Sequence, residues 1–310
     1  MAAKRIVRDP SELSGEPYPV IALGNFDGVH LGHQAILRTA REHAVEAGGR
    51  CFALTFDPAP AKVLFPSQAP ALITTPEDKL DLLCQTGLDG VLVMNFTREL
   101  SMLAPVEFVR QHLVGKIGAR EVVVGRTFTF GHDRAGDAEV MRKLGRQFDF
   151  GTTVVDSLVV DGVEVSSTKV REAIAAGDMR RVARMLGRAH FLSGVVVAGR
   201  GRGGKIGVPT ANLASDTECV PSNGVYAARV VVEGSVFPAI ANIGIRPTFG
   251  EAERAIEAHL LGYAGDLYGL RLRLELIERV RGERKFESAE DLTRQIARDI
   301  DYAKKVLAQG

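Results

Sequence analysis

The sequence has no tryptophan, and aromatic residues make up 6% of its 310 residues. Proteins that bind single-stranded nucleic acid stack its bases on aromatic side chains, so this scarcity disfavours that class. An excess of one charge is also lacking, because 39 Lys and Arg are balanced by 38 Asp and Glu. A balanced chain has no overall field that would attract nucleic acid or an acidic membrane. Any anion site must therefore be local.

Cysteine and long apolar runs are scarce as well. The three cysteines (Cys51, Cys84 and Cys219) lie far apart and form no Cys-x-x-Cys pair, which is typical of reduced thiols and not of a disulfide or zinc framework. No apolar run approaches the length of a bilayer span. The first residues, MAAKRIVRDPSELSGEPYP, lack the apolar core of a secretion signal. We expect a cytoplasmic protein without a membrane partner.

The first part of the chain alternates short apolar runs with helical patterns, and the length of the chain suggests two domains. Strands are predicted at residues 20–24, 51–56, 90–96, 121–125 and 152–156, and helices at 33–49, 75–87 and 104–118. Apolar runs of this kind are typical of strands buried on both faces. Strand–helix alternation predicts an α/β fold with a doubly wound parallel sheet. We assign this domain to residues 1–187.

The pattern changes after Gly187. Strand-like segments at 193–199, 224–234, 236–244, 255–263 and 270–280 are separated by Gly, Pro and Asn turns that leave no room for helices. This spacing predicts a small antiparallel β-barrel. Residues 288–307 have helical spacing, and we expect this C-terminal helix to cover the barrel. The second domain is assigned to residues 188–310.

A glycine-rich turn in VIALGNFDGVHLGHQAIL joins the first predicted strand to the first helix. His30 and His33 fall one helical turn apart near a helix N-terminus, where anions bind. Open α/β sheets bind ligands outside the carboxyl ends of their strands, where this turn should lie. Two imidazoles there suit hydrogen bonding to phosphate oxygens during in-line transfer. Two other interpretations stay open, namely a metal site that uses both histidines and a pair that only caps and packs the helix.

The segment GNFDGVHLGHQ resembles the HxGH signature of nucleotidylyltransferases, and its flanks resemble the adenylyltransferase half of the bifunctional riboflavin kinase/FMN adenylyltransferases. SSTKVREAI matches the second signature of that half, Ser-Ser-Thr-x-x-Arg, although by itself it predicts only a capped amphipathic helix. The resemblance implies that His30 and His33 stabilise the transition state and that further residues hold ATP and the departing pyrophosphate. These are Gly24, Asn25, Phe26, Asp27, Gly28, Gly32, Ser166, Ser167, Thr168 and Arg171. Ala59 in FDPAP and Thr127 in VGRTFTFG depart from the family pattern near the implied ATP or FMN pocket.

The loop GRGRGGKIGVPTANL satisfies the GxxxxGK part of a Walker loop but fails the rest of that pattern. Ile206 stands where a hydroxyl should reach Mg²⁺, and Pro209 disfavours the helix that should follow. The Walker interpretation is therefore rejected.

The same loop resembles the riboflavin kinase signature GxxxGRxxGFPTAN, with Gly204 and Val208 as departures. The resemblance implies that Thr210 and Asn212 hold Mg²⁺, which favours oxygen ligands. The implied ATP phosphate contacts are Gly199, Gly203, Gly207 and Pro209. Without the family, a glycine-rich barrel turn in which Asn212 caps a strand is an equal interpretation.

Further family matches extend to the C-terminus, and IEAHLLGYAGDLYG contains Glu257. By resemblance, Glu257 is the general base that takes the proton of the ribityl hydroxyl of riboflavin. By pattern alone it is an outward-facing strand residue. VRGERKF resembles a segment that approaches flavin through Arg281, Glu283 and Phe286, and Gly262 replaces an aspartate of the family.

The resemblance implies phosphorylation of riboflavin to FMN, followed by adenylylation of FMN to FAD, with ATP and Mg²⁺ used in each step. Two alternatives stay open. The chain acts as a riboflavin kinase with a weakened adenylyltransferase half, or it is a flavin-binding regulator without turnover. The expected partners are small-molecule substrates and not nucleic acid. The sequence leaves the oligomeric state open, with a weak homo-oligomer as the assembly considered.

Overall fold

The computed structural model describes residues 5–198, 208–247 and 252–309. By its contacts the chain divides into two compact units, Met1–Ser167 and Thr168–Gly310. The predicted domain boundary at residue 187 stays a prediction. Helices α7 (Ser167–Ala176) and α8 (Met179–Leu186) lie just before that boundary, and α8 packs against strands of the second unit.

The first unit is built on a six-stranded sheet with the strand order β1-β4-β3-β2-β5-β8. All neighbouring strands run parallel, which confirms the predicted α/β fold. The strands are β1 (Ile6–Val7), β2 (Pro19–Leu23), β3 (Arg50–Phe56), β4 (Gly90–Met94), β5 (Glu121–Gly125) and β8 (Gly151–Val155). Every residue of β2 and β4 is buried, as their apolar sequences predict.

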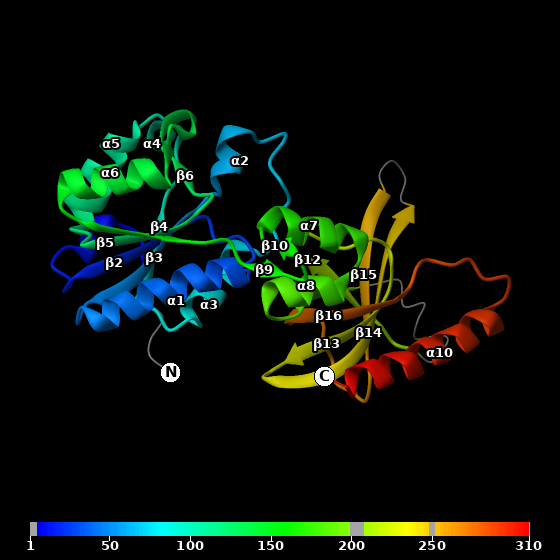
Figure 1. The fold of residues 1–310 in the computed structure, drawn as a ribbon. Helices are drawn as coiled ribbons and strands as arrows, with labels where there is room; N and C mark the ends of the chain where they lie inside the picture. The colour runs from blue at the N-terminus through cyan, green and yellow to red at the C-terminus, as the bar shows by residue number, and fades with distance from the viewer. Residues whose placement is uncertain (1–4, 199–207, 248–251, 310) are drawn as a thin grey trace. The chain divides into compact units, whose positions relative to one another are not determined.

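Helices cover both faces of this sheet (Figure 1). The α-helices are α1 (Leu31–Glu46), α2 (Pro60–Leu64), α3 (Pro76–Cys84), α4 (Arg98–Ser101), α5 (Pro105–Phe108) and α6 (Ala138–Phe148). The remaining elements are η1 (Pro10–Leu13), η2 (Val109–Ile117), η3 (His132–Arg134) and the short strands β6 (Thr129–Phe130), β7 (Gly136–Asp137), β9 (Val159–Val160) and β10 (Val163–Glu164).

Two helix predictions have different outcomes. Helix α3 begins as expected, because the Thr75 side chain caps it and Pro76 occupies its first turn. The predicted helix at 104–118 is instead a short α-helix, α5, that continues as the π-helix η2. Segments wound as π-helix are rare and not visible in a periodicity of 3.6 residues.

The sheet order reverses direction at β2. From β2 the chain proceeds to β3 and β4 on one side, and it later returns to place β5 on the other side. The space beyond the carboxyl ends of β2 and β5 is therefore the switch point where open α/β sheets bind ligands. The turn that contains His30 follows β2 and lies at this point.

The second unit contains a closed barrel with the strand order β11-β12-β15-β14-β13-β16. Its strands are β11 (His190–Val197), β12 (Ala211–Ser215), β13 (Gly224–Val232), β14 (Ser235–Pro247), β15 (Ala252–Leu260) and β16 (Arg271–Arg281). All of the pairings are antiparallel, which confirms the predicted barrel. Strand β12 was not predicted as a strand.

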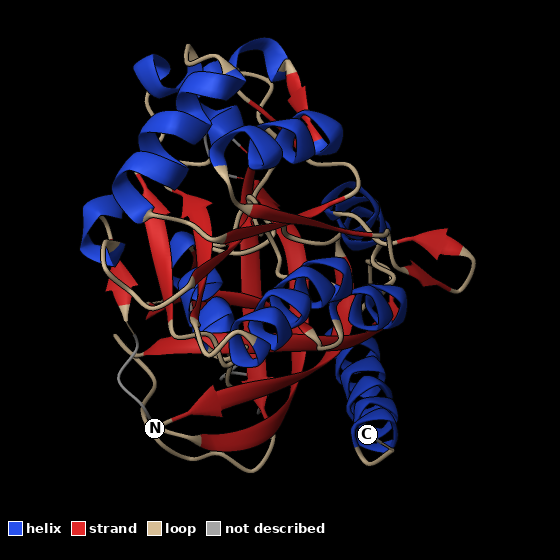
Figure 2. Ribbon diagram, turned by 60° about the vertical axis from the view of Figure 1, so that its left-hand side comes forward, coloured by secondary structure: helices blue, strands red, loops and turns tan. Residues whose placement is uncertain are grey.

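The C-terminal helix α10 (Ala289–Leu307) contacts β13, β14 and β16 and lies along the outside of the barrel (Figures 1 and 2). Ser288 caps its first turn. The prediction of a covering helix is confirmed. Within the described ranges, no helix is both long and apolar enough to cross a membrane.

Candidate functional sites

The turn after β2 holds a strained backbone. Phe26 and Val29 have φ angles of +54° and +41°, in the left-handed region that residues with a side chain rarely adopt. Gly28 has φ +80°, and a Cβ there would lie 3.0 Å from the Ile73 side chain. Non-glycine residues are held in such conformations only where the surroundings determine them, and these positions cluster at functional sites.

The two histidines of this turn are in direct contact. His30 is the N-cap of α1, and its Nδ1 accepts a hydrogen bond of 3.2 Å from the backbone N–H of His33. The two rings stack with centroids 3.5 Å apart. Gly32 leaves room for this arrangement, because a Cβ there would lie 3.2 Å from the His30 ring. Helix capping by His30 is therefore confirmed. Since its Nδ1 is an acceptor, the neutral imidazole carries its hydrogen on Nε2.

Burial keeps His33 neutral. It lowers the pKa of the His33 imidazole well below 6.5, and the nearby His30 and Lys79 lower it further. Nδ1 of His33 is buried and has no hydrogen-bond partner within the described part of the chain. In the same part of the chain, no group of three or more His, Cys, Asp or Glu residues is placed to hold a metal ion.

Other predicted residues of this site gather around the turn. The Asp27 carboxylate accepts hydrogen bonds from the backbone N–H groups of Ile73 at 3.0 Å and Thr74 at 3.3 Å, so it anchors a neighbouring loop. Ser167 donates from Oγ to the backbone oxygen of Asp27 at 3.0 Å. The start of the Ser-Ser-Thr-x-x-Arg segment therefore contacts the segment from Gly24 to His30 between β2 and α1, called the histidine turn below. Thr168 and Arg171 belong to the second unit.

The two departures from the family pattern lie at loop positions. Ala59 is the N-cap of α2 and supplies no side-chain hydrogen bond there. Thr127 is exposed between β5 and β6.

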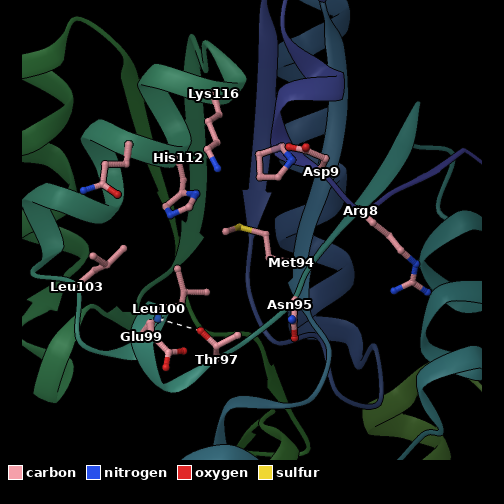
Figure 3. A pocket seen from close by; sticks show the side chains of 12 residues that line it. Arg8, Asp9, Met94, Asn95, Thr97, Glu99, Leu100, Leu103, His112 and Lys116 are labelled. Atoms are coloured by element: carbon pink, nitrogen blue, oxygen red, sulfur yellow. Dashed lines mark hydrogen bonds between the residues drawn. The ribbon is translucent and has the colours of Figure 1, made fainter.

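The first unit also contains a cavity of about 530 Å³ beyond the carboxyl ends of β1 and β4. His112 and Lys116 from η2 face Asp9 and Met94 across it (Figure 3). Burial lowers the pKa of His112. None of the residues predicted from the two adenylyltransferase signatures lines this cavity.

In the barrel, Glu257 occupies the middle of a row of polar side chains. It is paired in register with Asn212 of β12 and with Asn242 of β14. Directly paired residues project to the same face of a sheet. Ile256 and Ala258 are buried on the inner face, so the row Asn212–Glu257–Asn242 lies on the outer face. Asn242 was missed from the sequence, because cross-strand register cannot be read from spacing.

A second residue of β15 holds the predicted magnesium segment. His259 donates from Nδ1 to the backbone oxygen of Pro209 at 2.6 Å, and Pro209 directly precedes Thr210. His259 lies two residues from Glu257 and therefore on the same face of the strand. This alternation was a signal in the sequence that could have identified it. Gly199, Gly203, Gly204 and Gly207 lie outside the described residues.

The predicted flavin segment is held from two sides. Glu283 accepts a hydrogen bond from Asn223 at 3.1 Å. Its carboxylate also lies against Gly244, where a Cβ would be 2.6 Å from Oε1, so Glu283 is close to the polar row. Arg281 instead pairs with the buried Asp299 of α10 at 2.8 Å.

Phe286 is partly buried. The Arg281 guanidinium lies 5.6 Å from the centroid of its ring. Gly262 lies in an open turn with φ +79° and no heavy atom within 4 Å of an added Cβ among the described residues.

Comparisons with known proteins agree with an α/β unit followed by a barrel unit. The family model described as FAD synthetase matches residues 15–169, and the model described as riboflavin kinase matches residues 186–307. A bifunctional riboflavin kinase/FMN adenylyltransferase of Pseudomonas fluorescens is 39% identical over 290 residues, covering 93% of each chain. The protein of the same name from Escherichia coli K12 is 36% identical and covers 95% of each chain.

A solved structure from Streptococcus pneumoniae, described as a macrolide-efflux protein, has the same fold. Its TM-score is 0.88 at 27% identity, with 97% of this chain and 98% of that chain covered. Two family models cover most of the chain, and relatives 36–39% identical cover more than nine tenths of it, so the chain belongs to the bifunctional riboflavin kinase/FMN adenylyltransferase family, with the adenylyltransferase half preceding the kinase half.

Proposed function

We propose that the chain phosphorylates riboflavin to FMN in its barrel and adenylylates FMN to FAD in its α/β unit. The observation that carries this proposal is the presence of two separate groups of polar residues, one around the turn after β2 and one on the barrel, which fall within the ranges of the two family models in order. Both reactions move a phosphorus group from ATP to an oxygen of a flavin.

In the kinase reaction, Glu257 is the proposed general base. It takes the proton of the ribityl 5′ hydroxyl as this oxygen forms a bond to the γ-phosphorus of ATP. The bond from the γ-phosphorus to the bridging oxygen breaks, and ADP leaves. The register of Glu257 beside Asn212 and Asn242 supports this role, because it places the carboxylate among hydrogen-bonding groups on an accessible face.

The residues around Thr210 fit Mg²⁺. The Thr210 hydroxyl and the Asn212 amide oxygen are hard oxygen donors two residues apart, and His259 fixes the backbone just before them. When bound with ATP, the ion neutralises phosphate charge. The protein's own contribution is to hold these oxygens and Glu257 on adjacent strands.

In the adenylyl reaction, the FMN phosphate attacks the α-phosphorus of a second ATP, and pyrophosphate leaves. His30 and His33 are proposed to donate hydrogen bonds to phosphate oxygens as charge shifts in the transition state. Their position at the sheet's switch point and at the N-terminus of α1 supports this role. The proposed residues for pyrophosphate are Ser166, Ser167, Thr168 and Arg171.

The direct test is a time course with purified protein, riboflavin, ATP and Mg²⁺, in which FMN and FAD are separated. FMN should rise first and FAD should follow. Accumulation of FMN without FAD would favour the kinase with a weakened adenylyltransferase half. Tight flavin binding without ADP or pyrophosphate would favour the regulator.

The proposed location is the cytoplasm, where the three cysteines would stay reduced. All three are free thiols in the structure. Burial raises the pKa of the Cys51 thiol to about 12, which makes it unreactive as a thiolate.

A further inference from the structure

Lys79 is a buried cationic residue to which the proposed mechanism gives no role. It lies on the face of α3 that also carries Leu82 and Leu83, and 8% of its surface is exposed. Lysine is rarely buried, and burial of its charge is unfavourable unless hydrogen bonds or opposite charges hold it. The groups that hold Lys79 indicate what it does.

Its ammonium group is held at the end of β3. Nζ donates to the backbone oxygen of Phe56 at 2.9 Å and to Oγ1 of Thr55 at 3.2 Å. Thr55 Oγ1 in turn donates to the backbone oxygen of Asn25 at 3.0 Å. A continuous chain of hydrogen bonds thus runs from α3, through the end of β3, to the first residues of the histidine turn.

The loop before α3 contacts the same turn at a second place. Thr74 accepts at Oγ1 from the backbone N–H of Gly28 at 3.3 Å. The Asp27 carboxylate accepts from the backbone N–H of Thr74. Residues 73–79 therefore hold the turn both at Asn25 and at Asp27–Gly28.

Charge connects Lys79 to the histidines as well. Burial lowers the pKa of Lys79, while the carboxylates of Asp27 and Asp57 act to raise it. The Lys79 cation in turn lowers the pKa of His33, after the larger effects of burial and of His30. Among the described residues, the charged and titratable groups that act on the pKa of His33 are thus His30 on the turn and Lys79 on α3.

We propose that Lys79 is a positioning residue for adenylyl transfer. Through Thr55 it holds the start of the histidine turn in the geometry in which His30 and His33 meet the phosphates of ATP. This inference rests on the proposed function of the turn. Lys79 acts on the reaction through the turn and need not touch substrate.

The test compares Lys79→Met, Thr55→Val, the double variant and a matched control, Lys143→Met, whose lysine is exposed on α6. FAD formation from FMN and ATP measures the adenylyl step. FMN formation from riboflavin, catalysed by the same chain, serves as an internal control for folding. His33→Ala is assayed in parallel.

We expect Lys79→Met to lower kcat for FAD formation by about tenfold or more, the scale for losing a group that orients a functional residue. Thr55→Val should act in the same direction. The double variant should be no slower than Lys79→Met, because both residues act through one chain of hydrogen bonds. Riboflavin phosphorylation should stay within about twofold, and Lys143→Met should behave as the parent.

The pH dependence of FAD formation shows whether the charge of Lys79 acts on His33 or whether Lys79 only supports the fold of the turn. Without the neighbouring cation, His33 gains a proton more readily, so the acid limb of FAD formation should move to higher pH in Lys79→Met. Thr55→Val keeps the cation and should leave the limb in place. A limb that stays in place in Lys79→Met, or adenylylation equal to that of Lys143→Met, would overturn the proposal.

Failure of this inference differs from failure of the proposed function. If His33→Ala adenylylates FMN normally, the assignment of the turn is wrong. If His33→Ala is inactive and Lys79→Met is not impaired, only the role of Lys79 is wrong. Should Lys79→Met lose both activities, Thr55→Val decides, and normal FAD formation by that variant would refute the inference.

Discussion

The candidate residues from Gly24 to His33 in the α/β unit are neighbours in the chain, whereas the polar row Asn212–Glu257–Asn242 of the barrel is assembled across three strands. Residues 24–30 form a turn that leads into the first residues of α1, and its shape is set by left-handed backbone and by contacts from β3 and the loop before α3. In the barrel, Asn212, Glu257 and Asn242 come from three strands and meet through register. A parallel sheet gathers ligand-binding groups at its strand ends, while an antiparallel barrel can present them along one outer face.

The largest expected effect breaks the barrel site alone. Glu257→Gln keeps the size and polarity of the side chain but removes the base, so riboflavin phosphorylation should fall by about 10³-fold, within the usual range for general-base catalysis. FAD formation from supplied FMN should be unchanged. The two rates are measured on the same preparation, and equal losses in both would contradict the separation into two sites.

The complementary change breaks the turn. His33→Ala should lower FAD formation by about 10²-fold or more, the scale for losing one donor to a developing negative charge. Riboflavin phosphorylation should remain nearly intact. Loss of both activities in a folded protein would show that the two reactions do not use separate sites.

A smaller effect is expected from the residue that fixes the magnesium segment. His259→Ala removes the hydrogen bond to Pro209 O, and the Mg²⁺ concentration that gives half-maximal kinase rate should rise by about tenfold. His259→Gln retains a donor and should be affected less. If a Mg²⁺ titration gave the same midpoint for His259→Ala as for the parent, His259 would have no part in this site.

Acid should lower the stability of the barrel unit, while both reaction rates at pH 7 stay unchanged. In the barrel, burial lowers the pKa of His190 to about 4, and its Nε2 donates to the backbone oxygen of Cys219. The unfolded state binds a proton at His190 more tightly than the folded state does. The contribution of neutral His190 to the free energy of unfolding is therefore fully present above pH 6.5 and is lost as the pH falls toward 4. The loss is roughly 3 kcal/mol.

Hydrogen exchange of β11 and β13 measures this loss against pH. His190→Gln does not titrate, so its stability should fall less between pH 6.5 and 4 than that of the parent. An identical pH dependence in both proteins would rule out His190 as the source.

The comparison of the two sites also explains what could be predicted from the sequence. The ligand-binding turn at His30 could be predicted because the strand, the glycines and the histidines follow one another in the sequence. The apolar runs of the neighbouring strands predicted the parallel sheet. Glu257 could be placed on a strand, but its partner Asn242 depends on a register that only the folded barrel reveals. The sequence does not show the role of Lys79, because the hydrogen bonds to Thr55 and Phe56 exist only in the folded unit; its place three and four residues before Leu82 and Leu83 shows only that it shares their helix face.

The left-handed backbone at Phe26 and Val29 limits how the adenylylating half can evolve toward heat tolerance. Each such residue costs roughly 1–3 kcal/mol, and a glycine would relieve that cost locally. The same glycine would widen the range of shapes open to the segment that carries the imidazoles. Stabilising substitutions in this half are therefore better placed in the elements around the turn than at Phe26 and Val29 themselves.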